Sequence, residues 1–179
     1  MDSENLLYMI EQAFAWRQAP QCYISSSSKL FPNEIEETLS YQGKDWRSFK
    51  RAQLQKNYNV LYYISPEAYC YCLPGVMSAV IRENQADLLM VDSILSCLDR
   101  PPRHTGWDDF FLPRWTKFTL EEYDAIEQWL WWLCEHDSNG GHFDDMLTTV
   151  CRCIDTLNLL REEIKGFEDV KEHHGQTRK

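Results

Sequence analysis

The side chains that could hold a metal gather in the C-terminal third of the chain. Five of them follow one another there: Cys134, His136, His142, Cys151 and Cys153. A zinc site needs about four nitrogen or sulfur ligands that converge on one point. Cys151 and Cys153 are separated by one residue, and on a helix their sulfurs point about 160° apart because each residue turns by about 100°. They therefore fail as a chelating pair, and we expect no metal and no cofactor.

Nothing in the sequence matches a catalytic motif. There is no Gly-x-Ser-x-Gly elbow and no glycine-rich phosphate loop, and the chain has only 7 glycines. Three carboxylate pairs are adjacent in sequence, and helical neighbours point apart, which favours solvated charges over an acid–base pair. These pairs are Asp108/Asp109, Asp144/Asp145 and Glu162/Glu163. We expect no catalytic residues, with one alternative left open: a small enzyme whose site lies under residues 99–118 and is lined by His104, Asp108 and Asp109.

An unusual tryptophan cluster, Trp129-Leu130-Trp131-Trp132-Leu133, falls in a predicted helix over residues 119–136. The expected core stripe of this helix passes through Tyr123, Ile126, Leu130 and Leu133, which places Trp131 and Trp132 outside it. Tryptophan is a preferred interface anchor. We therefore predict a partner-binding surface made of Trp131, Trp132, Glu121, Asp124, Glu127, Asp144 and Asp145. The alternative is a central helix packed on several sides, with residues 99–118 lying over the rings.

The net charge of −10 is concentrated near the C-terminus. Residues 119–172 contain 14 acidic and 4 basic side chains, whereas residues 1–118 contain 14 and 12. Such a field repels nucleic acid and attracts cationic protein surfaces, although it also serves solubility alone. The compact basic patch is Arg47, Lys50 and Arg51, on a helix that Asp45 is expected to cap. Contact between this patch and the acidic face of another copy would make the chain a self-associating structural protein, and the oligomeric state stays open.

Length and composition predict one folded domain over residues 1–170 and a flexible tail over 171–179. The chain has 179 residues, of which 44% are hydrophobic, enough to bury a single core. No run approaches the roughly 20 apolar residues of a membrane helix, and the first residues lack the pattern of a signal peptide. Seven cysteines without framework spacing indicate reduced thiols. These features predict a cytoplasmic protein that binds no membrane.

Apolar periodicity predicts an all-α fold of six or seven helices. Helices are expected at about 3–16 with Ser3 as the N-cap, from Pro32, from Trp46, from Ser65, and at about 85–98, 119–136 and 143–167. Residues 60–64 have strand composition but no partner strand, so we expect helix or extended core filler there. Residues 99–118 are expected to form a long packed loop that covers one end of the core.

Several short motifs resemble those of a bacterial family of small helical domains to which no activity is assigned. They are Ala13-Phe14, Gly43-Lys44-Asp45-Trp46, Ser65-Pro66-Glu67-Ala68 and Leu73-Pro74, within residues 4–135. The resemblance implies a helical domain and supplies no mechanism. In size and charge the chain is also similar to the small acidic immunity proteins that neutralise bacterial toxins. We therefore expect a non-enzymatic binding module, an immunity or inhibitor protein that occludes a basic surface of a toxin-like partner.

Overall fold

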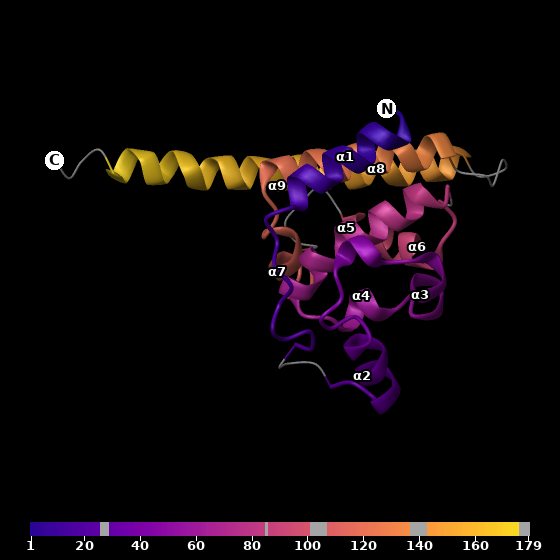
Figure 1. The fold of residues 1–179 in the computed structure, drawn as a ribbon. Helices are drawn as coiled ribbons and strands as arrows, with labels where there is room; N and C mark the ends of the chain where they lie inside the picture. Colours follow the sequence, from indigo (N-terminus) through magenta and orange to yellow (C-terminus); the bar gives the residue numbers. More distant parts are fainter. Residues whose placement is uncertain (26–28, 85, 101–106, 137–142, 176–179) are drawn as a thin grey trace.

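Three helices from the two ends of the chain lie side by side and form one layer of the computed structural model (Figure 1). α1 (Ser3–Phe14) packs against α8 (Leu120–His136), and α8 packs against α9 (Phe143–Gly175). The structure describes residues 1–25, 29–84, 86–100, 107–136 and 143–175, with side chains except at 143–145 and 165–175. Throughout these ranges the regular elements are helices, which confirms the predicted all-α class.

The centre of the molecule is α5 (Pro66–Arg82), which contacts α1 on one side and shorter helices on the others. Its start agrees with the sequence: Ser65 Oγ accepts a hydrogen bond from the Ala68 amide at 3.2 Å. Every residue from Ala68 through Ile81 is buried. This helix is therefore enclosed all round and does not show the single apolar stripe of a surface helix.

A close contact with the 3₁₀ turn η1 (Trp46–Ser48) explains a glycine in the middle of α5. A Cβ added at Gly75 would lie 2.5 Å from Phe49 Cδ2 and 2.6 Å from the Trp46 carbonyl oxygen. No larger residue fits that approach. α5 also continues through Pro74 without a break, so the neighbouring packing holds the helix together where one backbone hydrogen bond is missing.

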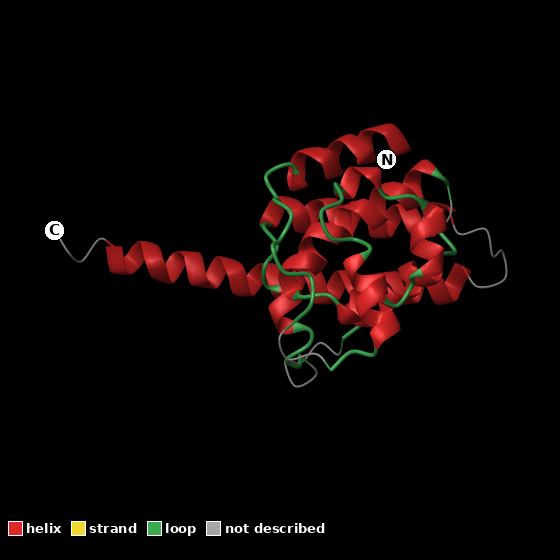
Figure 2. Cartoon of the chain, turned by 60° about the horizontal axis from the view of Figure 1, so that its bottom comes forward, coloured by secondary structure: helices red, strands yellow, loops and turns green. Residues whose placement is uncertain are grey.

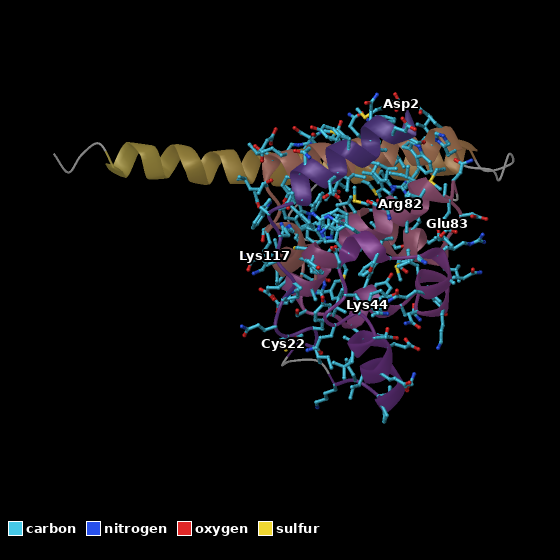
Figure 3. All side chains as sticks on the ribbon, viewed as in Figure 1. Asp2, Cys22, Lys44, Arg82, Glu83 and Lys117 are labelled. Carbon is cyan, nitrogen blue, oxygen red and sulfur yellow. The ribbon has the colours of Figure 1, made fainter. Side chains whose placement is uncertain are left out.

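The single helix predicted from Trp46 is wrong, since the chain forms η1 and then a separate helix, α3 (Arg51–Lys56). Phe49 and Lys50 between them have extended backbone, and Phe49 is buried against α5. Two polar contacts hold the junction in place at the C-terminal end of α5, where Figure 3 labels Arg82 and Glu83. Arg82 Nη1 donates to the Arg47 carbonyl oxygen at 3.0 Å, and the Arg51 amide donates to Glu83 Oε1 at 3.1 Å.

α2 (Pro32–Leu39) lies at the end of the molecule away from α1, and it packs against the short helix α4 (Val60–Tyr63) (Figure 1). α4 confirms that residues 60–63 are helical despite their strand composition. Ile64, just after it, is extended and forms an isolated bridge with Ile24. α6 (Leu89–Leu98) is shorter than predicted at its start, and it packs against α9 and α3.

The described part of the 99–118 segment is packed, as predicted. Four of its aromatic side chains are buried: Trp107, Phe111, Trp115 and Phe118. Asp108 Oδ1 accepts the Phe111 amide at 2.8 Å and so fixes the turn that leads into the short helix α7 (Leu112–Trp115). This segment closes one end of the core, while residues 101–106 lie outside the described part of the chain.

The last helix, α9, is longer than the sequence suggests, because it continues to Gly175 where the pattern predicts an end near residue 167. Its C-terminal part extends beyond the other helices (Figure 2). The tail predicted from residue 171 is therefore helical as far as 175. Residues 137–142, between α8 and α9, fall outside the described residues. Across the described ranges there are nine α-helices, whereas six or seven were predicted. The count is higher because α3, α4 and α7 are too short to be recognised from apolar periodicity. No helix in this part of the chain combines the length and apolar character needed to span a membrane.

Candidate functional site: a groove between α1 and α8

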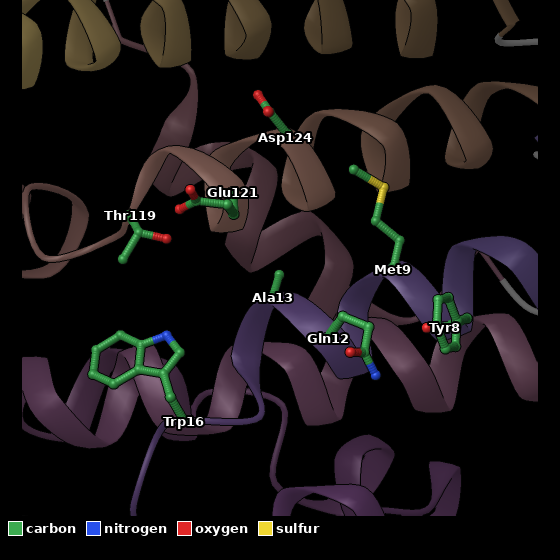
Figure 4. A pocket seen from close by; sticks show the side chains of 8 residues that line it. All are labelled: Tyr8, Met9, Gln12, Ala13, Trp16, Thr119, Glu121 and Asp124. Atoms are coloured by element: carbon green, nitrogen blue, oxygen red, sulfur yellow. The ribbon is translucent and has the colours of Figure 1, made fainter.

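A hollow of about 760 Å³ lies between the outer face of α1 and the N-terminal half of α8 (Figure 4). Its lining is mostly apolar on α1 and polar on α8: Tyr8, Met9, Gln12, Ala13 and Trp16 on the α1 side, and Thr119, Glu121 and Asp124 on the α8 side. The Trp16 ring stands on one side of the hollow and the Thr119 and Glu121 side chains stand opposite it. We name this feature the α1–α8 groove.

The packing of α1 determines which of its side chains reach the groove. Leu6, Ile10 and Phe14 recur every four residues and are fully buried against the core. The other side chains of α1 vary in exposure: Leu7, Met9 and Ala13 pack partly against the core, whereas Tyr8 is 66% exposed. Trp16, two residues after the end of α1, is 59% exposed. Two large aromatic rings exposed to solvent, one on α1 and one just after it, are the kind of surface that marks an interaction site.

A buried ion pair fixes the end of the groove. Arg17 follows α1 and donates through Nε and Nη2 to both carboxylate oxygens of Glu122, the second at 2.6 Å. Glu122 is fully buried, and Arg17 Nη2 also donates to the Lys117 carbonyl oxygen at 2.8 Å. Glu122 also forms a capping box at the start of α8, because its Oε2 accepts the Thr119 amide at 2.8 Å and its own amide donates to Thr119 Oγ1 at 3.3 Å. One carboxylate therefore joins the end of α1 to the start of α8.

The same guanidinium supports the exposed indole. The Arg17 Cζ atom lies 4.7 Å from the centroid of the Trp16 ring and 5.1 Å from that of Phe118. Cation–π contacts at these distances are attractive. Since Arg17 is itself held by Glu122, the Trp16 ring is positioned before any partner arrives.

The carboxylates near the groove differ in how far they are neutralised. Arg161 on α9 pairs with both Asp124, at 2.9 Å, and Glu127, at 2.7 Å. Glu121 is exposed and has no ion-pair partner among the described residues. Its own backbone amide and the Thr119 hydroxyl hold the pKa of Glu121 below its ordinary value. Glu121 is therefore the free negative charge at the groove.

The two tryptophans predicted to anchor a partner differ in their exposure to solvent. Trp131 is 37% exposed, on the strip of α8 that also carries Asp124 two turns earlier. Trp132 is only 1% exposed, so its predicted outward position is wrong. Its Nε1 donates to Ser3 Oγ at 3.0 Å, and its ring stacks on His136 with centroids 4.0 Å apart. The reason is that α1 covers the side of α8 next to the predicted core stripe.

Asp144 and Asp145, the remaining predicted partner-binding residues, lie in the first turn of α9, where only the backbone is described. Of the residues named for the enzyme alternative, Asp108 accepts the Phe110 and Phe111 amides in the turn before α7 and lies 4.0 Å from Arg100. Asp109 is exposed and His104 lies outside the described residues. No group of three or more histidine, cysteine or acidic side chains converges within the described ranges.

The basic patch predicted on one helix is not formed as such, because Arg47 belongs to η1 and Arg51 to α3. Arg47 pairs with Glu11 at 2.6 Å and with Asp45 at 3.3 Å. The hydrogen bond to Glu11, followed by that to Asp45, raises the pKa of Arg47. Lys50 is exposed between them. With one of its three charges satisfied within the chain, this surface is a weaker counterpart for an acidic face than the sequence suggests.

No family model, characterised protein sequence or solved structure compared with the chain matches it. The class of site is therefore defined by the groove alone. Sequence reasoning missed Tyr8, Trp16 and Arg17. A signal was available for the first two, because both fall off the apolar stripe of the predicted N-terminal helix. No local signal pointed to Arg17, because its partner Glu122 is 105 residues away in the sequence.

Proposed function

We propose that this chain is a protein-binding module without catalytic activity, and that its partner places a segment with apolar and cationic side chains in the α1–α8 groove. The proposal depends on one observation. A supported, exposed indole faces a carboxylate that has no ion-pair partner within the described chain, across an apolar hollow.

A lysine or arginine of the partner would lie between the Trp16 ring and the Glu121 carboxylate. That position offers a cation–π contact on one side and a charge-assisted hydrogen bond on the other. Neighbouring apolar side chains would lie on Met9 and Ala13. Methionine adapts to irregular apolar shapes, and alanine leaves room for an incoming group.

The charge distribution supports the same partner chemistry. The excess of acidic residues over 119–172 attracts cationic surfaces and raises association rates. Trp131 would extend the contact along α8. A protein that covers a basic surface of its partner acts by occlusion, so the finer proposal is an inhibitor or immunity-type protein directed at a toxin-like partner.

The test uses a defined probe, a short labelled synthetic helix with leucines on one face and lysines on the other, titrated by fluorescence anisotropy. Trp16→Ala should weaken binding by on the order of 30-fold, the effect of losing a hot-spot aromatic. Glu121→Gln should lower the association rate several-fold and reduce its dependence on salt.

Leu89→Ala is the matched control, because Leu89 is 54% exposed on α6 and does not line the groove. It should bind the probe like the unmodified chain. Circular dichroism checks that each variant keeps its helices. If Trp16→Ala is folded and binds the probe as tightly as Leu89→Ala does, the groove is not the docking site.

A further inference from the structure

α2 exposes its apolar side to solvent. Phe31, at its N-cap, is 71% exposed, Ile35 is 37% exposed and Leu39 is 45% exposed. The three residues are four apart, so they lie along one stripe of the helix. A helix at the surface of a folded domain ordinarily turns such a stripe toward the core. We name Phe31, Ile35 and Leu39 the α2 stripe.

Polar and small groups hold the other side of α2. Thr38 is fully buried, and α2 packs against α4. Glu34 Oε2 accepts the Phe31 amide at 2.7 Å and so fixes the first turn. At the other end Asn57 Nδ2 donates to Ser40 Oγ at 3.1 Å. The orientation of α2 is therefore set by contacts that leave its stripe uncovered.

Three carboxylates accompany the stripe on this short helix: Glu34, Glu36 and Glu37. Glu36 is exposed, and neither Glu36 nor Glu37 has an ion-pair partner among the described residues. Two copies of the chain meeting through α2 would bring these like charges together. An anionic membrane surface would be repelled for the same reason. The charges favour an apolar surface bordered by lysine or arginine.

We infer that the α2 stripe is a second docking surface, and that it takes a segment of another protein with apolar side chains flanked by basic ones. Figure 1 places α2 at the end of the molecule opposite α1 and α8. The two surfaces are far enough apart to be occupied together. The chain then joins two binding partners, or two parts of one partner, which a single-sided inhibitor does not do.

The experiment locates a probe by hydrogen–deuterium exchange. The same leucine–lysine helix is added at saturating concentration to the full chain, and exchange is followed over residues 29–41. Amides of α2 should become protected in the unmodified chain and in Trp16→Ala. The double variant Ile35→Ser with Leu39→Ser should lose this protection while its groove stays protected. Asn33→Ser, an exposed change on the same helix, is the control and should behave as the unmodified chain.

Three results would overturn the inference. Protection confined to the groove in the unmodified chain would show that α2 does not take this ligand class. Concentration-dependent dimerisation abolished by Leu39→Ser, seen by sedimentation, would assign the stripe to a second copy of the chain. Binding to vesicles of phosphatidylserine that Leu39→Ser abolishes would assign it to a lipid surface.

Discussion

Replacing Glu122 by glutamine removes the charge of the buried ion pair and keeps the size of the side chain. Glu122 is fully buried and the Arg17 side chain is only 10% exposed. The guanidinium cannot easily move into water, so its charge is left uncompensated. Breaking a buried pair in this way costs about 3–5 kcal/mol. The amide oxygen of glutamine can still accept the Thr119 amide, so the cap itself should survive.

Urea unfolding followed by circular dichroism measures this loss. With an m-value of about 2 kcal/mol per M, the midpoint should fall by roughly 2 M while the slope stays unchanged. Glu67→Gln is the matched control, because Glu67 pairs with Lys117 at 2.7 Å and both side chains are well exposed. A surface pair of this kind contributes about 1 kcal/mol or less.

Adding Arg17→Met to Glu122→Gln removes the stranded charge, and we expect part of the stability to return. The reasoning fails if Glu122→Gln is no more destabilising than Glu67→Gln. It also fails if the double variant loses more free energy of unfolding than the two single variants lose added together, since a stranded charge would then not be the cause.

Three further outcomes are expected. Gly75→Ala should destabilise the fold by about 1–3 kcal/mol in thermal unfolding, because its new methyl group overlaps the backbone of η1. Ser3→Ala should cost about 1–3 kcal/mol, since it leaves the buried Trp132 indole without its acceptor. Burial raises the pKa of Cys70 and of Cys153 to about 12, against about 8.5 in the unfolded chain. The native state keeps protons that the unfolded chain loses between these values, so the free energy of unfolding should fall as pH rises above about 8.5, by up to about 1.4 kcal/mol per pH unit for each thiol.

Each of these outcomes has its own check. Gln12→Ala changes an exposed side chain on the same helix as Ser3 and should change stability by about 0.5 kcal/mol or less, well below Ser3→Ala. A Gly75→Ala protein that melts like the unmodified chain would mean that η1 moves aside freely. A free energy of unfolding that is flat from neutral pH to about pH 10 would contradict the buried state of the thiols.

Local signals in the sequence were sufficient for the helices that begin with a recognisable cap. Ser65 before Pro66, and Thr119 with Glu122, marked the starts of α5 and α8 correctly. The start of α1 was predicted one residue late, because Asp2 rather than Ser3 accepts the first-turn amide. Ser3 instead accepts a hydrogen bond from the Trp132 indole on α8. Neighbouring residues in the sequence could not reveal this contact.

The candidate site was less accessible to sequence reasoning, because its groove is made by two helices that start more than a hundred residues apart. Periodicity identified one apolar stripe on α8 and so left Trp132 outside, but the position of α1 widened the covered side. The exposure of the α2 stripe could not be inferred for the opposite reason. Its apolar stripe follows an ordinary pattern, and only the fold decides that the stripe faces water.

Because α5 is completely enclosed, its residues are constrained by packing, whereas the exposed recognition residues are not. Nearly any change from Ala68 through Ile81 disturbs packing, whereas the side chains of Tyr8, Trp16 and Leu39 are exposed on α1, just after it and at the end of α2. The recognition residues can therefore diversify while the scaffold stays unchanged. Such a division would allow one fold to follow a rapidly changing partner without losing its ability to fold.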